Sequence, residues 1–411
     1  MIPRVRATGR RRLVADASRL QRATLAVYAV FIASGFAFAS WASRIPQVRD
    51  ALELSPRGLG LVLLAIALGS VVSMPLAGLV VSRLGTARTI AVTACLVAVG
   101  LAIAAVGVRV GVLPVVVGLL LLGLGNGTWD IAMNVEGALV EHRLGRAIMP
   151  RFHAGFSVGT VAGALVGAAM VALGVSVTAH LLGVAVAIAL VGPFAVRGFL
   201  PKADEQSVAH ERASSRSPLR AWTEPRTLLV GVFVFSAAFT EGTGNDWLGV
   251  AMIDGYGAAA AVGALTFSVF LGAMTLGRWL GPALLDRVPR VTAVRILAVV
   301  ALAGLSLVVF GWTLAVAVGG AALWGFGVSL GFPAGMSAAG DEPTHAAGRV
   351  SVVASIGYVA FLAGPPFIGF LGDAVGTLRA LTATAGLLAL GLLVSGALEP
   401  LGAARQRRGA P

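Results

Sequence analysis

The chain has 411 residues, of which 57% are hydrophobic and only 12% are charged. Soluble domains average about 25% charged residues, so this composition excludes an ordinary soluble domain and indicates a membrane protein. The net charge of +13 does not indicate nucleic-acid binding, because the basic residues lie at the chain ends, in one central segment and in short turns rather than in one patch.

Twelve apolar stretches follow one another along the chain, and each is long enough to cross a bilayer as a helix. We expect them at residues 24–43, 59–81, 88–106, 111–134, 152–174, 178–197, 226–248, 258–281, 292–311, 314–337, 350–371 and 378–397. Six precede a polar basic segment and six follow it. The sequence therefore predicts an all-α membrane protein, with an N-terminal six-helix bundle at 1–197, a cytoplasmic linker at 198–225 and a C-terminal six-helix bundle at 226–411.

The distribution of basic residues predicts the orientation. With the N-terminus in the cytoplasm, alternate loops place all but five of the 31 Lys and Arg residues inside. The five on the outside are Arg44, Arg49, Arg57, Arg109 and Arg379. Because cytoplasmic loops carry an excess of basic residues, we expect a multi-pass protein of a bacterial-type cytoplasmic (inner) membrane with both termini cytoplasmic, where the basic ends face anionic lipids.

Small residues predict close helix crossings. In the fifth stretch Gly155, Gly159, Gly163 and Gly167 recur every four residues and so share one helix face. The two halves of the chain also repeat short motifs. Leu124-Gly125-Asn126-Gly127 resembles Trp324-Gly325-Phe326-Gly327, which indicates that the halves are related.

Asp130 is the residue that most strongly indicates function. It lies in an otherwise apolar stretch, where a carboxylate costs about 3 kcal/mol and commonly marks an ion or proton pathway. Asn126, Asp130 and Asn134 are four residues apart and therefore share one helix face. An amide–acid–amide face suits a polar solute together with a proton, although a polar face that holds helices together is the alternative.

Glu241, in the seventh stretch, is the corresponding acid of the second half, and Asn245 follows on the same face. Glu241 either takes part in proton coupling or forms a structural pair. Candidate contacts for the solute are the amides and aromatic residues on these stretches, with belt residues at the membrane surface as the alternative for the aromatic ones. They are Asn126, Trp129, Asn134, Asn245, Tyr28, Trp41 and Tyr358.

The chain resembles the major facilitator superfamily over nearly its whole length. The loop Gly78-Leu79-Val80-Val81-Ser82-Arg83-Leu84-Gly85-Thr86-Ala87-Arg88 is similar to the superfamily's loop signature, with Ser82 in place of the usual Asp. Asp286 and Arg287 form the second copy. The resemblance implies a fold of two six-helix bundles related by a pseudo-twofold axis. It also implies gating roles for Arg83, Asp286 and Arg287.

A narrower segment, Asp130-Ile131-Ala132-Met133-Asn134, is similar to the fucose-permease branch. The resemblance implies that Asp130 serves in proton-coupled uptake. Because the first and seventh helices face each other in this superfamily, Arg44 is expected to face Asp246, either as an ion pair that closes the outer mouth or as two unrelated interfacial charges. His153, at the start of the fifth stretch, is a further candidate gate, with a solvated helix end as the alternative.

We therefore predict a secondary transporter that moves a small polar solute, such as a sugar, by alternating access with proton coupling. A proton-antiport efflux pump for drugs or metabolites is the alternative within transport, and a polytopic sensor or enzyme is the alternative outside it. We expect no enzyme activity, cofactor, metal site or nucleic-acid partner. The expected partners of the predicted monomer are its solute, protons and membrane lipids.

Overall fold

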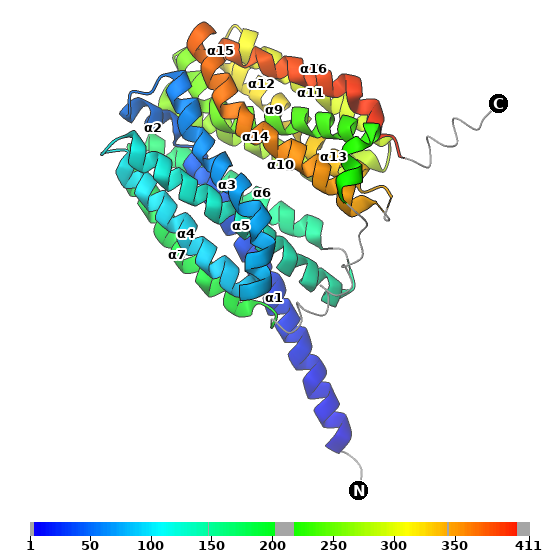
Figure 1. The fold of residues 1–411 in the computed structure, drawn as a ribbon. Helices are drawn as coiled ribbons and strands as arrows, with labels where there is room; N and C mark the ends of the chain where they lie inside the picture. The colour runs from blue at the N-terminus through cyan, green and yellow to red at the C-terminus, as the bar shows by residue number, and fades with distance from the viewer. Residues whose placement is uncertain (1–3, 147, 202–217, 343–344, 401–411) are drawn as a thin grey trace, which may run out of the picture.

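Helices form almost all of the described structure. The computed structural model describes residues 4–146, 148–201, 218–342 and 345–400 (Figure 1). Twelve helical segments in these ranges are long and apolar enough to cross a membrane, and each overlaps one of the predicted stretches. The described ranges contain no strand. The prediction of an all-α membrane protein is confirmed, whereas most of the predicted linker lies outside the described residues.

The first half of the chain supplies six spans. Its helices are α1 (Arg4–Ala42), α2 (Ile45–Ala51), α3 (Pro56–Leu84), α4 (Thr86–Gly107), α5 (Val112–Leu144), α6 (Met149–Ala172), α7 (Val177–Ala195) and the short η1 (Val196–Gly198). The first span is interrupted, because α1 ends at Ala42 and α2 starts afresh at Ile45. Pro46 lies in the first turn of α2, where a missing N–H is tolerated.

The second half supplies the other six spans. Its helices are η2 (Pro218–Thr223), α9 (Pro225–Tyr256), α10 (Ala260–Leu285), α11 (Arg290–Phe310), α12 (Leu314–Val328), α13 (Gly331–Ala339), α14 (Ala346–Val375), α15 (Thr377–Ala380), α16 (Thr382–Val394) and η3 (Ser395–Leu398). In Figure 1 these helices form one bundle and those of the first half form another. We call the ends that carry Leu200 and Glu224 the linker side, and the opposite ends the far side.

Glycines bring α1 and α6 into contact along the predicted small-residue face. A Cβ at Gly159 would meet the Ile32 carbonyl, and one at Gly163 would lie 2.5 Å from the Phe36 carbonyl oxygen. Any larger residue would therefore push α1 away from α6. The predicted close crossing is confirmed, and its cause is backbone-to-backbone contact.

The same glycine arrangement recurs in the two bundles. In the first, Gly123 meets α3 and Gly125 meets α4, so that α5 lies between these helices. In the second, Gly325 meets α10 and Gly327 meets α11, so that α12 is held in the same way. The sequence repeat thus corresponds to a repeat in packing.

The two bundles contact each other through α3 with α14 and through α6 with α10. At the first contact a Cβ on Gly60 would lie 2.5 Å from the Pro365 carbonyl oxygen, and one on Gly369 would lie 2.6 Å from the Pro56 carbonyl oxygen. Pro56 begins α3, so this tight contact is on the far side. The space between the bundles is therefore closed there by backbone packing.

Candidate functional site

The polar face of α5 lies at half-buried positions and is internally hydrogen-bonded. Asn134 Nδ2 donates to the backbone carbonyl of Asp130 at 2.8 Å and to Asp130 Oδ1 at 3.3 Å. Ser34 Oγ of α1 donates to Asn126 Oδ1 at 3.2 Å. Within the described residues no Lys or Arg forms an ion pair with Asp130, so its carboxyl group has an amide as its polar partner.

Tyr358 of α14 brings the second bundle to this face, because it is half-buried and close enough to Asp130 for the two groups to interact electrostatically. On the first bundle, the exposed His153 ring lies edge-on to Phe31, with 5.2 Å between centroids. Tyr28 packs edge-on against Phe152 at 4.8 Å. Asp130 and Tyr358 thus interact electrostatically across the bundles, while Tyr28 is part of the α1–α6 packing.

Glu241 differs from Asp130 in its surroundings. Arg278 Nη2 of α10 lies 2.8 Å from Glu241 Oε1, and both side chains are largely buried. Arg278 Nε also donates to the Ser329 carbonyl at 3.4 Å, where α12 ends. Of the two alternatives for Glu241, the structural pair is the one that this geometry forms. Arg278 was missed in the sequence because nothing local connects it with Glu241.

Two of the predicted solute contacts are corrected by the structure. Trp129 is 0% exposed, and its ring lies near Gly192 of α7 rather than at the bundle interface. Trp41 is 1% exposed. The indole N–H of each has no hydrogen-bond partner among the described residues. A large ring fits where Gly192 leaves space, so Trp129 is a core residue here and offers no surface to a solute.

Of the two alternatives for Arg44 and Asp246, the ion pair is not formed in this structure. Arg44 is buried and donates from Nε to His180 Nδ1 at 3.0 Å and from Nη2 to the Val175 carbonyl at 2.8 Å. Asp246 instead lines a small cavity between the bundles, next to Asn245. The turn after Ala42 directs Arg44 back towards its own bundle, which sequence spacing does not reveal.

A different ion pair joins the bundles on the far side. Arg49 Nη1 of α2 lies 2.7 Å from both carboxylate oxygens of Asp254 on α9. Arg49 also contacts Asp50 at 2.7 Å, and Thr377 Oγ1 donates to Asp254 Oδ2 at 2.9 Å. This cluster links α2, α9 and α15, so separation of the bundles on this side must break it.

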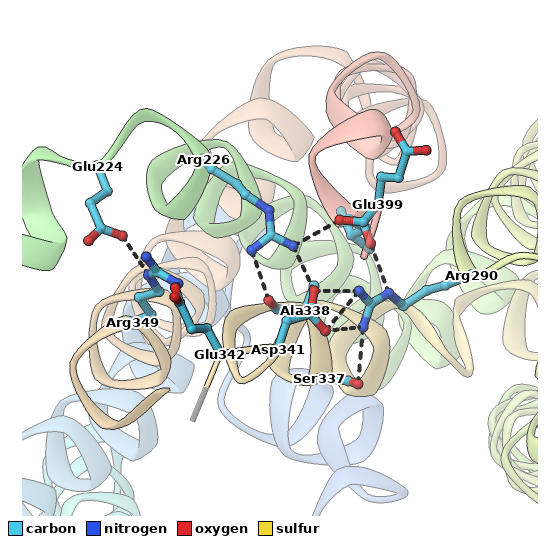
Figure 2. Close-up of polar contacts among 10 residues, drawn as sticks. Glu224, Arg226, Arg290, Ser337, Ala338, Asp341, Glu342, Arg349 and Glu399 are labelled. Carbon is cyan, nitrogen blue, oxygen red and sulfur yellow. Dashed lines mark hydrogen bonds and ion pairs between the residues drawn. The ribbon is translucent and has the colours of Figure 1, made fainter. Parts of the chain in front are cut away.

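On the linker side, charged residues connect the ends of four elements of the second bundle (Figure 2). Arg290 contacts both oxygens of Asp341, at 3.0 and 2.7 Å, and Arg226 reaches Asp341 at 2.8 Å. Arg226 also donates to the Glu399 carbonyl at 3.1 Å. The network holds the starts of α9 and α11 to the ends of α13 and η3.

A second cluster lies beside it (Figure 2). Arg349 Nε lies 2.6 Å from Glu224 Oε2, and its Nη1 lies 2.8 Å from Glu342 Oε2. The hydrogen bond from Arg349 lowers the pKa of Glu224, and Arg349 lowers the pKa of Glu342 in the same way. The segment before α9 is thereby attached to the start of α14.

Of the predicted gating residues on the linker side, Arg83, Asp286 and Arg287 are all exposed. Ser82, in place of the usual acid, donates to the Leu79 carbonyl at 2.9 Å. The buried acid of this region is Glu136 of α5, which accepts from Thr86 Oγ1 at 2.7 Å and from the Leu200 backbone N–H at 2.9 Å. Glu136 was not predicted from the sequence, because it lies just beyond the stretch expected at 111–134, although it falls within the observed helix Val112–Leu144.

Comparison with known proteins places this architecture. The sequence profile described as the Major Facilitator Superfamily matches residues 26–358. The "Uncharacterized transporter y4wD" of Sinorhizobium fredii (strain NBRC 101917 / NGR234) is 32% identical over 365 residues, covering 88% of this chain and 94% of its own. The "Membrane protein MosC" of Rhizobium meliloti is 27% identical, with 89% and 86% covered.

Solved structures show the same fold. A D-xylose–proton symporter superposes with a TM-score of 0.74 at 12% identity, covering 92% of this chain and 96% of its own. The E. coli fucose:proton symporter FucP gives a TM-score of 0.56 at 15% identity, with 91% and 98% covered. The profile match and the relatives each span most of this twelve-span chain, which therefore belongs to the Major Facilitator Superfamily.

Proposed function

We propose that this protein is a proton-coupled transporter of a small polar solute that works by alternating access. The observation that carries the proposal is Asp130, a half-buried carboxyl group on a membrane-spanning helix that pairs with no cation among the described residues. An unpaired acid at such a position can gain and lose a proton during each cycle, whereas an acid held by an arginine is kept ionised.

Glu241 and Asp130 have different surroundings, and we assign them different roles. Glu241 is held by Arg278 at 2.8 Å, so its role is to stabilise the second bundle by joining α9 to α10. Asp130 carries the proton. Its neighbour Tyr358 belongs to the opposite bundle, so protonation of Asp130 changes the electrostatics between the two bodies that must move.

The solute is expected to contact the polar face of α5. Asn126 and Asn134 offer amide donors and acceptors, and Tyr358 offers a hydroxyl group and an aromatic face from the other bundle. Groups of this kind recognise a hydroxylated solute such as a sugar better than a hydrophobic drug. The printed names of the structural relatives, a D-xylose–proton symporter and a fucose:proton symporter, support this class of solute.

The linker side is proposed to face the cytoplasm, because it carries most of the Lys and Arg residues in its loops. The Arg49–Asp254 pair then closes the outer mouth in this structure. In the proposed cycle the bundles separate on the outer side to admit the solute. They then close around it and separate on the cytoplasmic side, with Asp130 losing its proton there.

The test measures pH outside lightly buffered cells that carry the wild type, Asp130→Asn or Asp373→Asn, while sugars and other small metabolites are added. Asp373 is an exposed acid near the far-side end of α14 and serves as the matched control. We expect solute-dependent alkalinisation with the wild type and the control, and none with Asp130→Asn.

Two outcomes would contradict the proposal. Alkalinisation that persists in Asp130→Asn would remove Asp130 from the proton path. Acidification on addition of solute would show exchange of solute for protons and would favour the efflux alternative. Cell-surface expression of each variant, measured on the same cells, separates loss of function from loss of protein.

A further inference from the structure

A small cavity lies between the two bundles towards the far side, with space for about one particle of the size of water. One wall is the break between α1 and α2, with Ala42 and Ser43. The opposite wall is α9, with Asn245 and Asp246. The cavity is therefore formed by both bundles, at a place where one helix is interrupted.

The side-chain oxygens of the α9 wall lack partners. Asn245 is 9% exposed, and its Oδ1 is buried without a hydrogen bond. Asp246 is half-buried and forms no hydrogen bond or ion pair with any described residue. Burying an unpaired carboxylate or amide oxygen costs free energy, so such groups normally have a ligand, a proton or a water molecule as their partner.

The opposite wall supplies backbone oxygens. Pro46 has no N–H, so the Ala42 carbonyl loses the donor that a continuous helix would provide. The backbone hydrogen bonds of the described residues include none to the Ala42 or the Ser43 carbonyl. In membrane transporters, carbonyls freed at interrupted helices are common ligands of Na⁺.

The charges near the cavity indicate which ion fits. Arg44 is adjacent in sequence, but its guanidinium group is directed to His180 and Val175. The single carboxylate of Asp246 balances one positive charge. A divalent ion would leave an excess charge in a region of low dielectric constant. A set of oxygens alone is typical of a hard cation, and the small volume excludes an organic cation.

We propose that this cavity is a binding site for Na⁺, with Asp246, Asn245 and the carbonyls of Ala42 and Ser43 as its oxygen ligands. The ion would join the interrupted first span to α9 and so hold the bundles together on the far side. The proposal goes beyond the proton path through Asp130 and does not depend on it.

The test measures equilibrium binding of radioactive Na⁺ to the purified full-length protein in lipid nanodiscs, at constant pH, with choline replacing Na⁺ to keep ionic strength constant. We expect saturable binding to the wild type, weakened by about tenfold or more in Asp246→Asn, because even indirect ligand partners contribute that much to metal affinity. Asn245→Ala should weaken binding as well. Glu53→Gln, which neutralises an exposed far-side acid, should bind like the wild type.

Several outcomes would overturn the proposal. They are absence of saturable binding to the wild type, equal affinity in Asp246→Asn, and loss of binding in Asp130→Asn with Asp246→Asn unaffected. Proton uptake that depends on Asp246 without any binding of Na⁺ would make the cavity a protonation site instead. If Asp246→Asn does not fold, unchanged affinity in Asn245→Ala would count against the site. Because Asp130→Asn should retain Na⁺ binding, failure of the proton-coupling proposal and failure of this one are distinguishable.

Discussion

Removing the Arg49–Asp254 ion pair is expected to open the far side of the protein. Both contacts of Arg49 Nη1 with the carboxylate are 2.7 Å long, and the side chains are 11% and 29% exposed. A hydrogen bond to a charged group contributes about 1.5–3 kcal/mol. Because Asp254 is nearly one-third exposed, we take the lower end, about 1.5 kcal/mol, which is about tenfold in the ratio of closed to open molecules.

The opening can be followed by alkylation of a single introduced thiol. Gly249 lies across the closed interface from Pro46, and a Cβ there would be 3.4 Å from the proline ring, so Gly249→Cys should be tolerated. With the native Cys95 replaced by alanine, we expect Arg49→Ala to accelerate labelling by a membrane-impermeant maleimide about tenfold. Arg109→Ala removes an exposed far-side arginine and should leave the rate unchanged.

Because Arg49 also contacts Asp50, a double-mutant cycle is needed to isolate the contribution of the Arg49–Asp254 pair. If the pair closes the far side, Arg49→Ala combined with Asp254→Asn should label no faster than the more affected single variant. Labelling rates that multiply in the double variant, or a rate in Arg49→Ala equal to that of the parent, would refute the reasoning.

Three further predictions concern stability. Glu241→Gln should lower the unfolding midpoint and cost about 3 kcal/mol of stability, because Arg278 is left without its partner in a largely buried position. Combining it with Arg278→Gln should restore most of this loss. A double variant as unstable as the single one would contradict the prediction. Arg349 lowers the pKa of Glu224 from its ordinary 4.5, so the stability that the Glu224–Arg349 pair gives to the fold is present above that pH and is lost as the pH falls below it. The unfolding midpoint should therefore decline less on acidification in Glu224→Gln than in the wild type. Parallel pH profiles of the two proteins would be contrary to this expectation. Gly159→Leu would force α1 and α6 apart and should destabilise the protein by ~3 kcal/mol. Gly183→Leu, at a position with open space, should be nearly neutral in unfolding measurements. Equal effects at the two glycines would show that the α1–α6 crossing tolerates separation.

The candidate site could be predicted only in part. Asp130 and its asparagines were identified because four-residue spacing on a helix is a local property. For Glu241 the same reasoning left proton coupling and a structural pair as alternatives. Spacing alone could not decide between them, because Arg278 lies 37 positions from Glu241 along the chain and reaches it through the packing of α9 on α10. Trp129 was expected to contact the solute and is instead a core residue, since the orientation of its ring depends on the space beside Gly192.

The far side shows most clearly what could not be predicted from the sequence. Charge and helix order led to the expectation that Arg44 faces Asp246, and the bundles are indeed joined near that place. The ion pair uses Arg49 and Asp254 instead, because the break after Ala42 re-orients the chain and returns Arg44 to His180. A pairing over 205 positions depends on where two rigid bundles touch, and residue spacing carries no information about that contact.

The sequence by itself determined the twelve spans, their division into two groups of six and the glycine faces. Each of these follows from a local requirement: in lipid, backbone groups must be satisfied within the helix, about 20 apolar residues are needed to cross, and close helices need small residues. Only the tertiary structure decided which acids are paired, which tryptophans are buried and where the bundles close. Those properties arise from contacts between distant helices, whose free energies depend on atomic distances of a few ångströms that no local pattern specifies.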